Sequence, residues 1–184
     1  MNKQAENIKA VNDAWLNINV DDSKIINPFS VPTEEEFTTK LTWLMTNPDY
    51  FSFLCKELLN IEILPTQALM LKEMWNRKFP MLIASRGFGK SYILSVYAIL
   101  RALLMPGRKI IIVGAAFRQS KVLFEYMDGI WRNSPLLRDI VGSYGGPRRG
   151  VDMCRLTIGE STVTCLPLGD GSKIRGQRAN DIIA

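Results

Sequence analysis

The stretch "MLIASRGFGKSYILS", residues 81–95, constrains the fold most, because an apolar run stops at two glycines, a lysine and a serine and then resumes. The short apolar run "FPMLIAS" predicts a buried strand over 79–85, and the apolar segment from Lys90 to about Leu104 predicts a helix. Glycines between a strand and a helix let backbone N–H groups approach an anion, and the helix start adds its dipole. The stretch therefore predicts a phosphate-binding turn.

This turn fits the P-loop pattern G-x-x-x-x-G-K-[ST] at every position but the first glycine, where Ala84 stands. Lys90 is expected to reach the β- and γ-phosphates of a nucleotide, Ser91 to ligate Mg²⁺, and Arg86 to neutralise charge on the γ-phosphate. The residues predicted to bind the nucleotide in the turn are Ser85, Arg86, Gly87, Phe88, Gly89, Lys90 and Ser91. A chance turn with an unrelated lysine is the alternative. A dinucleotide-binding pattern is excluded, because no third glycine follows Gly89.

Gln67 follows Pro65 and Thr66 at the predicted start of a helix over "LPTQALMLKEMWNRK". A glutamine amide donates and accepts hydrogen bonds at once, as the edge of an adenine base requires. Gln67 is therefore a candidate adenine-binding residue, and an ordinary exposed glutamine is the alternative.

Beyond the turn, the sequence predicts a second buried strand over "KIIIVGAA" and an amphipathic helix over "FRQSKVLFEYMDGIWRNS". Strand, helix, strand and helix in this order predict an α/β fold with a mainly parallel sheet flanked by helices. After Pro135 we predict two more strands, "MCRLTI" and "STVTCLPL", joined as a hairpin at Gly159-Glu160, and "NDIIA" starts another. The glycine- and arginine-rich segments around the hairpin are predicted to be functional loops.

Helices are predicted before the turn. One runs from about Lys3 to Trp15, and another follows Thr33, which forms a capping-box pattern with Glu36. A third starts after Asn47-Pro48-Asp49. We therefore expect a helical N-terminal region over residues 1–60 and a P-loop ATPase domain over 61–184.

Composition narrows the chemistry. The chain has no histidine, which excludes imidazole bases and histidine metal ligands, and its three cysteines lack metal-ligand spacing. An odd cysteine count disfavours a disulfide framework and predicts a reducing, intracellular setting. Residues 1–79 carry 8 Lys/Arg against 11 Asp/Glu (−3), and residues 80–184 carry 15 against 7 (+8). A basic second half suits an anionic ligand such as nucleotide or nucleic-acid phosphate, with solubility alone as the alternative.

No membrane segment is predicted. The first 15 residues mix charged and polar groups instead of forming the apolar region of a signal peptide. The longest apolar run, Tyr92 to Met105, carries Arg101. Its length of 14 residues is too short to span a bilayer.

Three segments together, "LPTQALML", "ASRGFGKS" and "GSKIRGQRANDIIA", resemble the N-terminal ATPase of the large terminase subunit of tailed bacteriophages and prophages, over about 61–184. The resemblance implies an ATPase that uses ATP and Mg²⁺ to translocate double-stranded DNA into procapsids. It implies a homo-oligomeric ring on the portal vertex in the host bacterial cytoplasm, with the small terminase subunit and the portal as partners. Lys90, Ser91, Arg86 and Gln67 keep the roles given above. Arg175 is implied to act on a neighbouring subunit's ATP, with Arg178 as the alternative.

The resemblance also implies a strand ending in Asp-Glu, which binds Mg²⁺ and activates water. The segment "NDIIA" is similar to the beginning of that strand, and the acids do not follow within the sequence. We therefore expect a fragment that lacks these acids and the nuclease domain and has little turnover alone. The alternatives are another P-loop nucleic-acid motor, such as a helicase-like ATPase, or a nucleotide-binding fragment without turnover.

Overall fold

The computed structural model describes residues 33–142, 146–169 and 176–184. By its internal contacts the chain divides into two units, Met1–Thr39 and Lys40–Ala184. The helix predicted over 3–15 and the candidate interface residue Arg175 lie outside the described residues. The domain boundary at residue 60 stays a prediction. The first described helix crosses this boundary, and every later helix and strand belongs to the second unit.

Between residue 33 and the glycines the structure describes four helical elements, in the order α2 (Glu34–Thr46), the short 3-10 turn η2 (Pro48–Tyr50), α3 (Phe51–Leu59) and α4 (Pro65–Asn76). The capping box is confirmed, since the Glu36 N–H donates to Thr33 Oγ1 and the Thr33 N–H donates to Glu36 Oε2, both at 3.3 Å. The predicted start after Asn47 is also confirmed, because its side chain accepts a hydrogen bond from the Asp49 N–H. Local sequence therefore determines these helix starts.

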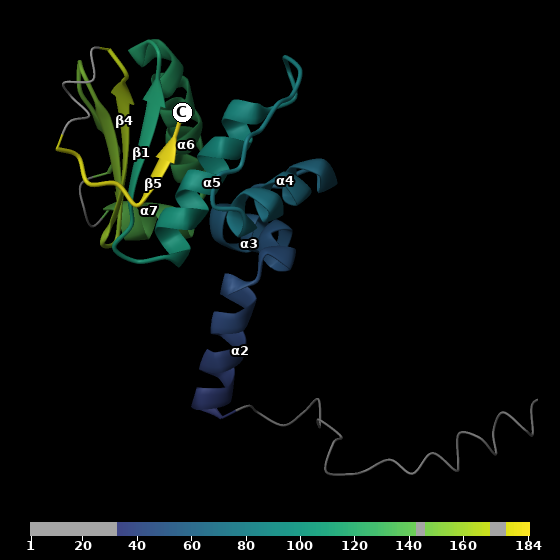
Figure 1. Ribbon diagram of the computed structural model, residues 1–184. Helices are drawn as coiled ribbons and strands as arrows, with labels where there is room; N and C mark the ends of the chain where they lie inside the picture. Colours follow the sequence, from purple (N-terminus) through teal and green to yellow (C-terminus); the bar gives the residue numbers. More distant parts are fainter. Residues whose placement is uncertain (1–32, 143–145, 170–175) are drawn as a thin grey trace, which may run out of the picture. The chain divides into compact units, whose positions relative to one another are not determined.

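A five-stranded mixed sheet follows, with strand order β2-β3-β4-β1-β5. Its strands are β1 (Lys109–Gly114), β2 (Arg148–Arg149), β3 (Cys154–Ile158), β4 (Ser161–Pro167) and β5 (Asp181–Ile183). β1 pairs in parallel with β4 and β5, which run beside it in Figure 1, whereas β3 pairs antiparallel with β4 and with β2. The predicted α/β class and the hairpin are confirmed, but the prediction of a mainly parallel sheet is not, since two of the four strand pairings are antiparallel. The sheet is mixed, because the hairpin adds β3 and β2 in antiparallel orientation.

The helices α5 (Lys90–Leu104), α6 (Phe117–Asn133) and α7 (Pro135–Gly142) cover one face of the sheet. Side chains of alternate strand residues, including Ile110, Ile112 and Leu156, form one core cluster with buried residues of these helices and of α3 and α4. We call this side the helix face. On the second face, Ile111, Val113 and Leu166 form a separate small cluster with Ala179, and this cluster contains no helix residue.

The prediction of a buried strand over 79–85 is wrong. No strand is assigned there, and Phe79, Met81 and Ile83 are each 86% exposed. An apolar run becomes a buried strand only where a sheet offers a free neighbouring edge. Both edges of β1 are paired, one with β4 and one with β5, and the run pairs with neither outer strand, β5 or β2, so it has no strand partner and stays exposed.

One helix was not predicted. α7 begins at Pro135, directly after Ser134, whose Oγ accepts a hydrogen bond from the Leu137 N–H at 3.1 Å. The same hydroxyl donates to the Leu58 carbonyl at 2.7 Å and so ties the start of α7 to α3. Serine at the N-cap followed by proline at the first helical position is a helix-start signal that the sequence contains.

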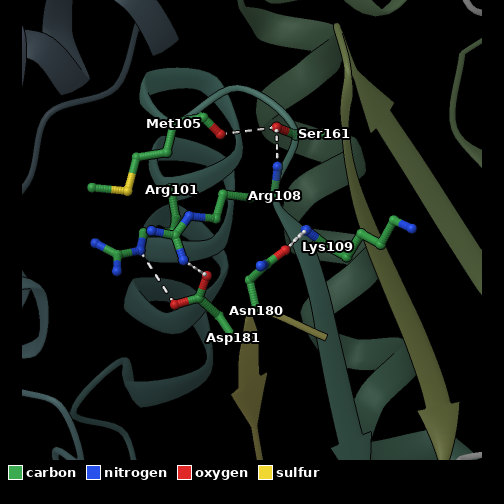
Figure 2. A network of polar contacts seen from close by, with 7 residues as sticks. All are labelled: Arg101, Met105, Arg108, Lys109, Ser161, Asn180 and Asp181. Carbon is green, nitrogen blue, oxygen red and sulfur yellow. Dashed lines mark hydrogen bonds and ion pairs between the residues drawn. The ribbon is translucent and has the colours of Figure 1, made fainter. Parts of the chain in front are cut away.

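Polar contacts fix the start of β5 (Figure 2). The Asp181 carboxylate contacts Arg101 Nε of α5 at 3.3 Å and Arg108 at 3.5 Å. Next to it, Asn180 Oδ1 accepts from the Lys109 N–H, and the Asn180 N–H donates to the Lys109 carbonyl, both at 2.8 Å. A strand of three residues is thereby anchored to both β1 and α5.

Arg101 also joins the α4 helix to this network. Its guanidinium carbon lies 4.6 Å from the centroid of the Trp75 ring, a cation–π distance. Trp75 in turn contacts Phe51 of α3 and Tyr97 of α5 edge to face, with centroid distances of 4.7 and 6.1 Å. Packing around Trp75 therefore connects α3, α4, α5 and β5.

Replacing Arg101 with glutamine should lower the free energy of unfolding by about 2 kcal/mol, between the values typical of exposed and of buried ion pairs. The reason is that the side chains of Arg101 and Asp181 are each only 14% exposed, so Asp181 would lose its main partner. Urea denaturation measures the change. Arg77→Gln is the matched control, because it removes an exposed pair with Glu73 on α4 and should cost less than about 0.5 kcal/mol. If both variants lowered the free energy of unfolding equally, the Arg101–Asp181 pair would not stabilise the fold more than an exposed ion pair.

Candidate phosphate-binding site

The glycine turn, residues 85–89, leads directly into α5. Gly87 has φ +85° and Gly89, the residue before α5, has φ +84°. Both values lie in the left-handed region that glycine enters without a steric penalty. The first N–H groups of α5 have no acceptor within the helix, because the earliest helical bond runs from the Ile93 N–H to the Gly89 carbonyl. The turn therefore presents free backbone donors at a helix start, where anions bind.

Lys90 folds back over the turn. Its Nζ donates to the Ala84 and Ser85 carbonyls, both at 2.6 Å. An ammonium group has three N–H donors, so one remains for an anion at the turn. The lysine therefore stabilises the turn and keeps its charge beside the free backbone donors.

Gln67 lies against the same turn. A Cβ placed on Gly89 would lie 3.1 Å from Gln67 Nε2, which brings the first turn of α4 next to the glycine turn. Gln67 Oε1 accepts the Leu64 N–H at 3.0 Å, and this bond caps α4. An amide oxygen has a second lone pair and Nε2 has two N–H groups, so the side chain keeps an acceptor and donors for a further partner. The structure thus brings together two predicted site residues that are far apart in the sequence.

The other predicted residues lie around the turn. Ser85, Arg86 and Phe88 are exposed, and the structure shows no ion pair for Arg86 among the described residues. Ser91 is half-buried in the first turn of α5. Arg178, the alternative to Arg175, is exposed in the segment before β5. The guanidinium of Arg86 is therefore available to an anion bound at the turn.

A pocket of about 740 Å³ opens beside Ser91. Most of its lining is apolar and comes from the carboxyl ends of β1 and β5 and the first turns of α5 and α6. Ligands of α/β proteins bind at the carboxyl ends of parallel strands. Gln119 of α6 also lines this pocket, and the sequence analysis did not select it. Its position just after a predicted strand was the signal that could have identified it.

The described residues include few side chains that could bind a metal ion or act as a reactive thiol. Within the described residues, no group of three or more His, Cys, Asp or Glu side chains could hold a metal ion. Ser91 can supply one hydroxyl ligand, and Mg²⁺ commonly takes its other ligands from phosphate oxygens and water. All three cysteines are free and buried, and burial raises the pKa of the Cys55 and Cys165 thiols to about 12. These two thiols therefore stay protonated and unreactive near neutral pH.

Comparisons with known proteins do not assign a family. No family model matches the chain, and no curated protein matches it significantly. None of the helices in the described ranges has the length and apolar character needed to cross a membrane.

Gly89→Ala should destabilise the chain more than Gly87→Ala. Each change forces a side chain into the left-handed region, at a cost of about 1 to 2 kcal/mol. Only the Cβ at residue 89 would also press on Gln67 Nε2, since no atom lies within 4 Å of a Cβ at residue 87. Urea denaturation of both variants measures the difference. That difference should disappear in a Gln67→Ala background, and its persistence would show that Gln67 does not contact the turn.

Proposed function

We propose that this chain binds ATP with Mg²⁺ at the glycine turn and is the N-terminal ATPase part of a terminase large subunit, the motor that packages viral DNA. The observation that supports nucleotide binding best is the meeting of Gln67, Gly89 and Lys90 at one helix start. An amide that can pair with a base edge and a lysine that can bind phosphate, both at one turn, match the two ends of a nucleotide.

Each residue has a distinct task in this proposal. The N–H groups at the start of α5 and the remaining Lys90 proton donate to phosphate oxygens, and Ser91 ligates Mg²⁺. Arg86, exposed in the turn, neutralises charge on the terminal phosphate. Gln67 accepts from and donates to the adenine edge while its second Oε1 lone pair caps α4. ATP supplies the phosphoryl group that hydrolysis releases, and Mg²⁺ neutralises negative charge on the phosphates.

The wider role follows from the resemblance of three segments to terminases. It comprises a homo-oligomeric ring on the portal of a procapsid, double-stranded DNA as the translocated substrate, and the small terminase subunit as a partner in the host bacterial cytoplasm. Arg175, or Arg178 in its place, would act on the ATP of a neighbouring subunit. A helicase-like ATPase would share the glycine turn and Gln67, whereas the segment "GSKIRGQRANDIIA" favours the terminase.

Lys90→Ala should weaken ATP binding by about 10- to 100-fold, the loss expected for a charge-assisted hydrogen bond to phosphate. Isothermal titration of the full chain with ATP and Mg²⁺ measures the affinity. Lys56→Ala is the control, because Lys56 is exposed on α3 and pairs only weakly with Glu62. Retention of wild-type affinity by Lys90→Ala would remove the nucleotide-binding assignment.

Gln67→Glu should reduce the preference for ATP over GTP by about 10-fold, since it removes the Nε2–H groups that would donate a hydrogen bond to an adenine ring nitrogen. This substitution keeps a carboxylate oxygen for the Leu64 N–H, so the cap of α4 survives. The repulsion between the added charge and the phosphates is common to both nucleotides and cancels in the ratio of the two dissociation constants. An unchanged ratio would leave Gln67 as a capping residue alone.

A further inference from the structure

The second face of the sheet carries cations that form no ion pair with any described residue. In the antiparallel pairing of β2 with β3, Arg148 lies directly opposite Arg155. Both side chains are exposed, and neither forms an ion pair with the described residues. Like charges directly opposite each other on one face destabilise a sheet. An anion bound between the two guanidinium groups would offset this repulsion.

The strand register places this pair on the second face. Cys154, Leu156 and Ile158 of β3 are buried in the core cluster of the helix face, so Arg155 and Thr157 between them point to the other side. Arg149, the neighbour of Arg148, confirms this alternation, because it reaches Asp128 of α6 on the helix face.

Lys109 extends the cationic surface across the sheet. It pairs in register with Thr162, which pairs in turn with Thr157. Its neighbour Ile110 lies in the core on the helix face, and Figure 2 shows the Lys109 side chain pointing away from the Arg101–Asp181 pair. Three strand spacings separate β2 from β1, which corresponds to about 14 Å. The cations therefore span a surface wide enough to contact several phosphates of a duplex.

No carboxylate of the described strands neutralises these cations. Among the described strand residues, the second face holds no carboxylate, because Asp181 lies in register with Ile110 on the helix face. Between the cations lie the half-buried hydroxyls of Thr157 and Thr162, which are neutral donors that suit phosphate oxygens. No helix residue joins the small apolar cluster of this face.

We propose that the cationic face, formed by Arg148, Arg155 and Lys109 with Thr157 and Thr162, binds the phosphate backbone of double-stranded DNA. This inference rests on the proposed function, since it names the surface of the motor that contacts its DNA. The contacts are to phosphates and carry no base sequence information. This surface is on the opposite side of the sheet from the helices, whereas the glycine turn lies at the start of α5 on the helix face.

The test compares the full chain with a variant that carries Arg148→Thr and Arg155→Thr. Fluorescence anisotropy with a short labelled duplex, without nucleotide, measures affinity from about 50 to about 200 mM salt. We expect weaker binding to every sequence and a salt-dependence slope smaller by about two, because roughly 0.9 counterion is released per phosphate contact. The matched control carries Arg138→Gln and Lys56→Gln, which remove two exposed charges from α7 and α3 and should leave the slope unchanged.

Two further readouts separate this inference from its alternatives. The melting temperature of Arg155→Thr should stay equal or rise, because the opposed charges are relieved, whereas a structural role of Arg155 would lower it. The ATP affinity of the double variant should stay unchanged. A negative result in the DNA-binding assay alone would therefore contradict the DNA-binding surface and leave the proposed nucleotide site unaffected. Three outcomes would each overturn the proposal. They are an unchanged DNA affinity of the double variant, a parent chain that does not bind the duplex, and competition by polyglutamate that is as strong as competition by DNA. The last outcome would indicate an acidic protein partner.

Discussion

The pairing of β1 on both of its edges is the constraint on which the rest of the structure depends. β4 and β5 lie beside β1 in the same direction, so the carboxyl ends of all three strands meet at one edge of the sheet. The first turns of α5 and α6 meet at that edge, where they line one pocket. The same pairing divides the sheet residues between a face covered by helices and a face on which cations remain accessible. The apolar run before the glycine turn pairs with none of the five strands and lies outside the sheet.

Contacts within the chain hold the glycine turn in place. Lys90 has two carbonyl acceptors within the turn, and Gln67 already contacts Gly89 while capping its own helix. Groups that are held in place in this way lose little conformational entropy when they bind, which favours affinity. Each side chain also keeps hydrogen-bonding capacity for a ligand, since Lys90 has a third N–H and the Gln67 amide has a second oxygen lone pair and two N–H groups.

Local signals predicted much of this fold. The capping box at Thr33 and Glu36, the helix start after Asn47 and the hairpin at Gly159 depend on neighbouring residues, and the structure confirms each of them. The outcome for the run over 79–85 could not be predicted from its composition, since burial of an apolar run in a sheet depends on pairing with strands that are distant in the sequence. The contact of Gln67 with the glycine turn is also long-range: the sequence suggested both parts, and only the packing of α4 beside the start of α5 brings them together. The start of α7 at Ser134-Pro135 was a local signal that was overlooked.

The position of Trp75 has an optical consequence. The indole contacts aromatic rings from α3 and α5 and the guanidinium of Arg101, which also holds β5. Tryptophan emission shifts in wavelength and intensity when a nearby charge or ring moves. A chain in which the other three tryptophans, Trp15, Trp43 and Trp131, are replaced by phenylalanine would therefore carry a built-in fluorophore at the junction of four elements. Such a chain reports rearrangements between the helix that bears Gln67 and the helix that bears Lys90 without any attached dye.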